Sequence, residues 1–277
     1  MPSLTIAGPA GALHVVDHPA AVPRPDAGAG SSREAPPVVL VHGMVGHAGF
    51  WEAPLAHVAG RRRAVAIDLR GHGASEPPPD ADYAPSACAA DVLAVLDALA
   101  LPRVALVGHS YGALVALAVA ADHPERVARL LLADPPRDFT QIPAEVQAQH
   151  FPPYLAALAA DGWRDTAVAA FNEALAGSTP ATRETVLARV AATPHDRILG
   201  MSRHLLEFEA VNALDRYLAA PGARARAIVA PSNAWPQSLH ALRPALTAVV
   251  LPETSHWLML DAPAAFAAEL EAWLDAA

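Results

Sequence analysis

The sequence contains no lysine, because all 19 basic residues are arginine. Without a lysine amine, the chain can neither form a lysine Schiff base nor build the phosphate-binding lysine of a P-loop. The single cysteine, Cys88, excludes a disulfide within the chain, and the N-terminal residues show no signal-peptide pattern. We therefore expect a cytoplasmic protein in which Cys88 is a small buried apolar side chain.

Positive charge and long hydrophobic runs are also scarce. The net charge of −9 argues against nucleic acid as a partner, which would require a basic surface. The longest apolar run, 113–121, is far shorter than the roughly 20 residues that cross a bilayer. No metal-binding or dinucleotide-binding motif is present. We expect no cofactor, no metal and no membrane contact, but a monomer or homodimer that acts on a small-molecule substrate.

What the chain does have is a series of short apolar runs, each ending in a polar or glycine residue. They cover 37–41, 63–67, 103–107 and 127–133. Uninterrupted apolar strands are typical of a parallel sheet covered on both faces, and helical patterns at 84–99 and 111–122 lie between them. This predicts an α/β fold with a doubly wound, mostly parallel sheet and its chemistry at the carboxyl ends of the strands.

Other segments complete this organisation. An initial hairpin (3–7 and 11–17) and a loop rich in proline and glycine (18–37) precede the first of these strands. After residue 135, helical patterns follow one another without an intervening strand, until strands resume near the end of the chain. The helices are predicted at 143–160, 163–176, 181–192 and 196–219, the strands at 225–230 and 245–251, and a last helix at 262–274. We predict a core formed by 1–134 and 223–277, with 135–222 inserted as a helical cap.

The clearest chemical motif is Gly108-His-Ser110-Tyr-Gly112, a G-x-S-x-G sequence between a predicted strand and a predicted helix. A serine on such a tight turn adopts a strained backbone, and side chains two positions away on either side would collide. Glycine is therefore needed at both positions. The turn directs the hydroxyl above the sheet, which predicts Ser110 as a nucleophile.

Three further segments resemble a known family in the same order along the chain. They are the strand and loop 39–44, the D-x-R-G-x-G-x-S turn 68–75, and Ser255-His256-Trp257 followed by 261–263. With the serine motif, the chain resembles the α/β-hydrolase superfamily over nearly its whole length. This resemblance implies His256 as general base and the backbone amides of Met44 and Tyr111 as the oxyanion hole.

The third member of the triad departs from the usual pattern. Members of this superfamily commonly carry the acid after the strand 226–230, but residues 230–235 contain no carboxylate. Asn233 in that segment can only form hydrogen bonds, and we expect its loss to have little effect. In some relatives the acid lies instead at the tip of the strand after the nucleophile helix, where this chain has Asp134. We therefore predict Asp134 as the residue that orients His256.

The other polar residues of these motifs are expected to have structural roles. His109 should flank the pocket, and Asp261 resembles a position that caps the last helix. The residues expected to hold loops are His42, Asp68, Arg70 and His72.

Together these residues predict a serine hydrolase that cleaves a carboxylic ester or lactone of a small, moderately hydrophobic substrate through an acyl-enzyme. Carbon–carbon bond hydrolysis and cofactor-free perhydrolysis use the same triad and stay open. A serine at 110 argues against haloalkane and epoxide hydrolysis, in which a carboxylate attacks. A hypothesis of another class is a ligand-binding, receptor-like protein on the hydrolase fold.

Overall fold

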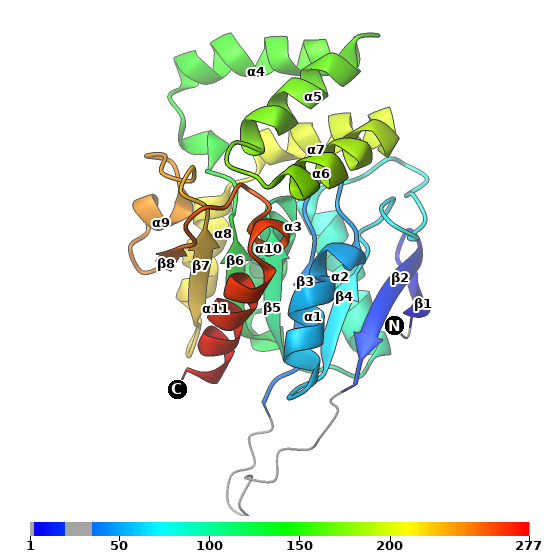
Figure 1. Ribbon diagram of the computed structural model, residues 1–277, viewed down its shortest axis with the longest axis vertical. Coiled ribbons are helices and arrows are strands. Elements are labelled where there is room, and N and C mark those ends of the chain that lie inside the picture. Colours follow the sequence, from blue (N-terminus) through cyan, green and yellow to red (C-terminus); the bar gives the residue numbers. More distant parts are fainter. Residues whose placement is uncertain (1–2, 20–34, 277) are drawn as a thin grey trace, which may run out of the picture.

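The computed structural model describes residues 3–19 and 35–276, which form one eight-stranded sheet covered by helices (Figure 1). The strand order is β1-β2-β4-β3-β5-β6-β7-β8; β1 and β2 pair antiparallel, β2 pairs antiparallel with β4, and all other neighbours are parallel. The strands are β1 Ser3–Gly8, β2 Gly11–His18, β3 Val38–Val41, β4 Ala64–Ile67, β5 Val104–His109, β6 Val127–Ala133, β7 Ala225–Val229 and β8 Thr247–Val250. The predicted α/β fold with a mostly parallel sheet is confirmed.

Both faces of the central strands β3, β4 and β5 are buried, which explains their uninterrupted apolar sequences. Successive side chains of a strand point to opposite faces. Val39 and Val41 accordingly join the core beneath α2, α3 and α8, whereas Val38 and Leu40 join the core beneath α1 and α11. These helices are α1 Glu52–Ala59, α2 Pro85–Ala98, α3 Tyr111–Asp122, α8 Ala210–Leu218 and α11 Pro263–Asp275.

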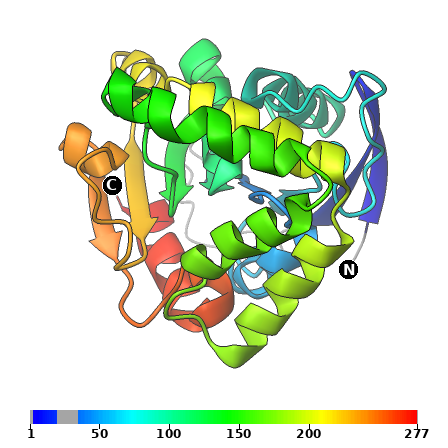
Figure 2. The same cartoon turned by 90° about the horizontal axis from the view of Figure 1, so that it is seen from above.

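Four further helices lie across the end of the sheet at which the parallel strands terminate (Figure 1). Seen from above, they cover much of that end (Figure 2). They are α4 Ala144–Ala159, α5 Trp163–Ala174, α6 Pro180–Ala192 and α7 His195–Glu207. The predicted helices 143–160, 163–176 and 181–192 correspond to the first three, and the division of the chain into core and cap stays a prediction.

The single helix predicted at 196–219 is wrong. Phe208 is extended, so α7 ends at Glu207 and α8 begins at Ala210. The Asp138 side chain accepts a hydrogen bond from the amide of Val211 at 2.8 Å and so satisfies the new helix end. This cap comes from far away in the sequence and leaves no local signal. As a result α8 packs on α3, against the sheet, rather than lying above it with α4–α7.

Other differences from the predicted elements are small. Helices α1, α9 Leu239–Leu242 and α10 Leu258–Asp261 were not predicted, and most of the predicted loop 18–37 lies outside the described residues. Cys88 is buried, as predicted.

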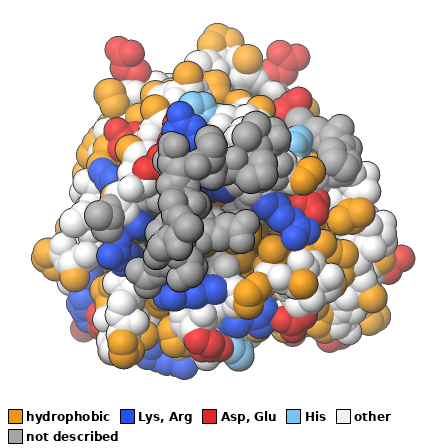
Figure 3. All heavy atoms as spheres, turned by 90° about the horizontal axis from the view of Figure 1, so that it is seen from below, with side chains coloured by type: hydrophobic (Ala, Val, Ile, Leu, Met, Phe, Trp, Pro, Cys, Tyr) orange, Lys and Arg blue, Asp and Glu red, His pale blue; other side chains and the backbone are white. Residues whose placement is uncertain are grey.

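None of the helices in the described part of the chain is long and apolar enough to cross a membrane. On the face seen from below, the described basic, acidic and apolar side chains are interspersed (Figure 3).

Candidate active site

The G-x-S-x-G segment forms a sharp turn between β5 and α3. Ser110 has a positive φ of 52°, a conformation that side chains rarely adopt and that the surrounding packing must hold. A Cβ atom added to Gly108 would lie 2.2 Å from the carbonyl oxygen of Gly112, and one added to Gly112 would lie 2.4 Å from that of His42. Both glycines are therefore required by packing, as the motif predicted.

Asp134 and His256, separated by 122 positions in the chain, are joined at the carboxyl end of β6. The Oδ2 atom of Asp134 lies 2.5 Å from Nδ1 of His256. Its other oxygen, Oδ1, accepts the amide of Ala230 at 2.8 Å and the side-chain amide of Asn233 at 3.1 Å. Asp134 is only 3% exposed, and because both of its carboxylate oxygens have partners the group is held in one orientation toward the imidazole.

Asn233 has a role that the sequence did not predict. Its Nδ2 group donates to Asp134 and, at 2.9 Å, to the carbonyl of Pro135. Its Oδ1 accepts the hydroxyl of Ser238 at 2.7 Å, which orients the amide. Asn233 thus lies in the segment where the family resemblance commonly has the acid, and it supports Asp134, which comes from the neighbouring strand. The location of Asn233 in the segment where the family pattern commonly has the acid was the one signal in the sequence that could have indicated this supporting role.

The loop that carries His256 is held by neighbours on two sides. The amide of His256 donates to the carbonyl of Ala174, at the end of α5, at 3.2 Å. Asp261 accepts the amide and the hydroxyl of Ser255 at 2.8 and 2.6 Å, and also the amide of Thr179 at 2.9 Å. The predicted capping role of Asp261 is wrong, since Ala262 is the N-cap residue of α11. Asp261 instead anchors the histidine loop to the segment after α5.

His109 connects the nucleophile turn to this loop. Its Nε2 lies 2.9 Å from the carbonyl oxygen of His256, and the two rings have centroids 4.9 Å apart. Burial holds the pKa of His109 well below its ordinary value, so the ring is neutral and donates this hydrogen bond. The hydrogen bonds of the described residues do not include one between Ser110 and His256, a contact that often tightens only when substrate is bound.

The predicted oxyanion loop lies directly beside the serine. A Cβ atom added to Gly43 would lie 2.7 Å from Cβ of Ser110. Met44 and Val45 form a tight turn in which the amide of Gly46 donates to Gly43 at 3.1 Å, and Val45 has a φ of 57°.

The second predicted donor, the amide of Tyr111, belongs to the first residue of α3. Amides in the first turn of a helix have no acceptor within that helix.

Arg189 of α6 donates to the carbonyl of Val45 at 3.2 Å, so a helix above the sheet also supports the predicted oxyanion loop.

The histidine of the oxyanion loop has the structural role expected of it. His42 lies with Nδ1 2.7 Å from the carbonyl of Gly43 and accepts the amide of Leu69 at Nε2, at 3.0 Å. Burial lowers its pKa to about 4, so it is a neutral hydrogen-bonding group. Asp68 accepts the amide of Ala74 at 2.9 Å and thereby holds the adjoining turn.

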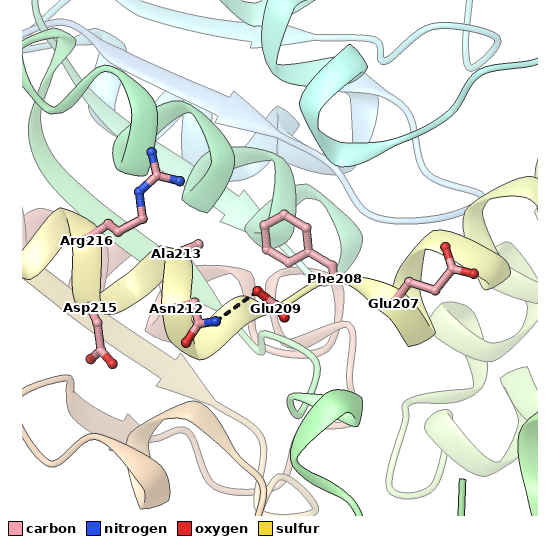
Figure 4. A pocket seen from close by; sticks show the side chains of 7 residues that line it. All are labelled: Glu207, Phe208, Glu209, Asn212, Ala213, Asp215 and Arg216. Atoms are coloured by element: carbon pink, nitrogen blue, oxygen red, sulfur yellow. Dashed lines mark hydrogen bonds between the residues drawn. The ribbon is translucent and has the colours of Figure 1, made fainter. Parts of the chain in front are cut away.

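A metal site and a cavity are two further features that can indicate where a ligand binds. In the described part of the chain, no group of three or more histidine, cysteine, aspartate or glutamate residues could hold a metal ion. A cavity of about 740 Å³ lies at the junction of α7 and α8, and Figure 4 shows Glu207, Phe208 and Asn212 among the residues lining it. Its lining includes none of the candidate catalytic residues.

Comparison with known proteins places the chain among hydrolases. A protein named as a carbamate hydrolase, RutD, from Variovorax paradoxus (strain S110) is 46% identical over 98 residues, which are 35% of this chain and 37% of that protein. The 2-hydroxymuconate semialdehyde hydrolase of Pseudomonas sp. (strain CF600) is 40% identical over 110 residues, or 39% and 37% of the two chains. These aligned segments thus span just over a third of each relative.

The resemblance in structure extends over the whole chain. A crystal structure of a hydrolase from Pseudomonas aeruginosa PA01 matches with a TM-score of 0.76 and 25% identity, and the match covers 99% of this chain and 98% of that one. The model of the alpha/beta hydrolase family matches residues 38–269, a range that includes the serine turn, the acid and the histidine. The chain belongs to the alpha/beta hydrolase family.

Proposed function

We propose that this hydrolase cleaves a carboxylic ester or lactone of a small, moderately hydrophobic substrate, with Ser110, His256 and Asp134 as its triad. The observation that carries the proposal is the 2.5 Å contact between Asp134 and His256, beside a serine held at a φ of 52°. A strained serine turn and an oriented imidazole are the parts that nucleophilic acyl transfer requires. Residues 135–222, with α4–α7, would cap the substrate.

Each residue has a defined part in this reaction. The hydroxyl of Ser110 attacks the carbonyl carbon while Nε2 of His256 takes its proton, and Asp134 stabilises the resulting imidazolium through Nδ1. The amides of Met44 and Tyr111 bind the developing oxyanion, and each such donor is worth about 3–4 kcal/mol. The imidazolium returns its proton to the leaving alkoxide. Water, activated by the same imidazole, then releases the acid from Ser110.

Carbon–carbon bond hydrolysis is the second candidate. It is favoured by the 40% identity to a protein named 2-hydroxymuconate semialdehyde hydrolase, although that identity covers only 39% of this chain. The same nucleophile, base and oxyanion donors would serve a carbon leaving group, provided that the substrate stabilises the carbanion. Incubation with a vinylogous 1,5-diketone acid would distinguish the two reactions. Such a substrate contains no ester bond, so an enzyme that cleaves only esters would leave it intact.

An active-site label tests the proposal. A fluorophosphonate probe should label the protein at one site, and p-nitrophenyl butyrate should be hydrolysed; both should be lost in Ser110→Ala because the nucleophile is gone. Ser232→Ala, which changes an exposed serine, is the matched control and should behave like the wild type. A folded protein that reacts with neither reagent would contradict the proposal and favour a ligand-binding role.

A further inference from the structure

Arg137 lies three residues after Asp134, and aromatic rings hold its guanidinium. Its Cζ atom lies 4.1 Å from the centroid of the Trp235 ring and 5.1 Å from that of Phe139. Aromatic faces attract a guanidinium and can stack on it, while its N–H donors project in the plane of the group and stay available. The side chain is half-buried, which makes it a held cation rather than a free surface arginine.

Two hydrogen bonds hold the backbone on either side of Arg137, close to the candidate triad. The side chain of Asn233, which supports Asp134, donates to the carbonyl of Pro135 at 2.9 Å, and the amide of Asp138 donates to Gln237 at 2.9 Å. Arg137 lies between Pro135 and Asp138, the two residues held in this way. Its Cα can be no more than about 11 Å from that of Asp134, because three residues of extended chain reach no further. In Figure 1 this segment rises from β6 toward α4 on the side of β7 and β8.

Helix α5 bounds the same region from the other side. Burial lowers the pKa of Arg137, and the charge of Glu173, at the end of α5, opposes this effect. Glu173 directly precedes Ala174, whose carbonyl accepts the amide of His256 at 3.2 Å. Arg137 thus packs on rings from the loops after β6 and β7, and the end of α5 that contacts the histidine loop carries a charge that acts on it.

This guanidinium has no close counter-ion in the described part of the chain, where the ion pairs do not include Arg137. The neighbouring carboxylate of Asp138 is already engaged. It accepts the amide and the hydroxyl of Thr140 at 2.9 and 2.6 Å, and the amide of Val211 at 2.8 Å. The charge of Arg137 is therefore available to a ligand.

We infer that Arg137, Trp235 and Phe139 form a subsite for a carboxylate group of the substrate, remote from the carbonyl that Ser110 attacks. The inference rests on the proposed function and narrows its substrate class to esters or lactones of acids that carry a second, ionised carboxyl group. A planar guanidinium binds a carboxylate through two parallel hydrogen bonds. The same rings would pack on the carbon chain between the two carboxyl groups.

A pair of matched esters tests the subsite. p-Nitrophenyl hemiglutarate and p-nitrophenyl pentanoate differ in having a terminal carboxylate or a methyl group. Arg137→Met removes a hydrogen bond between charged groups and the binding free energy that it supplies. It should therefore lower kcat/KM for the hemiglutarate about 10- to 100-fold, with little change for the pentanoate. Arg137→Lys should be intermediate, because it keeps the charge and loses the bidentate geometry. Equal losses on both esters would overturn the inference, since they would indicate packing alone.

Arg164 offers the matched control. Its guanidinium also lies over an aromatic ring, 4.5 Å from the centroid of Trp163, but it is exposed at the start of α5. Arg164→Met should leave the ratio of the two kcat/KM values unchanged. If Arg164→Met reduces this ratio as much as Arg137→Met does, the preference reflects overall charge and the subsite is overturned.

A binding measurement separates this inference from the proposed function. In Ser110→Ala, calorimetry should show monomethyl glutarate binding at least about 5-fold more tightly than methyl pentanoate, and Arg137→Met should remove the difference. If the wild-type protein cleaves neither ester, the proposed function fails. Charge-dependent binding that requires Arg137 would still support the subsite, and its absence would overturn it.

Discussion

At the scale of single residues, the candidate site depends on how one carboxylate is held. Asp134 has a φ of 41° and directly precedes two prolines, so its backbone is strained and confined. Hydrogen bonds from Ala230 and Asn233 fix one carboxylate oxygen, and the other is left for His256. A carboxylate held in this way can impose one tautomer on the imidazole, because only the Nδ1–H form satisfies it.

Substitutions at these two positions should have graded effects. Asp134→Asn should lower kcat by about 10³- to 10⁴-fold, because the amide cannot stabilise the imidazolium. Asn233→Ala should lower kcat about 10-fold with little change in KM, because the acid loses one hydrogen bond and not its charge. Steady-state kinetics measures both effects, with Ser232→Ala as control. A wild-type kcat in Asn233→Ala would show that Ala230 alone orients Asp134.

At the scale of elements, the loops that carry the site are tied to helices far away in the sequence. The carbonyl of Ala174, at the end of α5, accepts a hydrogen bond from the amide of His256. Arg189 of α6 donates a hydrogen bond to the carbonyl of Val45 in the predicted oxyanion loop. Movements of the helices above the sheet would therefore act directly on His256 and on the loop that carries Met44, the proposed base and one proposed oxyanion donor. The start of α8 is held in a similar way, by the carboxylate of Asp138.

Removing that carboxylate should destabilise the junction of α7 and α8. Asp138→Ala deletes the acceptor for Val211 and Thr140 in a position that is 1% exposed. Unsatisfied buried amides are costly, so the free energy of unfolding should fall by about 2–4 kcal/mol. Urea denaturation followed by circular dichroism measures the change. Asp161→Ala, at an exposed position, should be within about 0.5 kcal/mol of wild type, and an equal loss there would refute the assignment.

At the scale of the whole molecule, several buried histidines stabilise the fold only while they are neutral. Burial lowers the pKa of His42 to about 4 and that of His72 to about 3, and it holds that of His109 well below its usual value. The unfolded chain protonates these rings near pH 6.5. Below that pH the unfolded state binds more protons than the folded state, so protonation favours unfolding.

Stability should therefore be constant above about pH 7 and fall as the pH decreases from 6.5 toward 4. Each such histidine contributes a slope of about 1.4 kcal/mol per pH unit within this window. Urea denaturation at a series of pH values measures the slope. His72→Asn should reduce the slope, because it removes one of these buried rings. A flat profile between pH 6.5 and 4 would contradict the assignment of these rings as neutral.

The sequence alone determined the features that depend on local geometry and on the periodicity of apolar residues. The two glycines around Ser110 are required by contacts within one turn, and the apolar strands follow from burial on both faces, so both could be predicted. Asp134 could be proposed only because the alternative segment lacks a carboxylate.

The tertiary structure alone decided which side chains support the site. Asn233 contacts Asp134 across 99 positions, Asp138 caps a helix 73 positions away, and Asp261 accepts the amide of Thr179 across 82 positions instead of capping α11. Each of these contacts joins segments that only the packing of neighbouring strands and helices brings together. A hydrogen bond between distant segments leaves no periodic pattern in the sequence, and for that physical reason it could not be predicted.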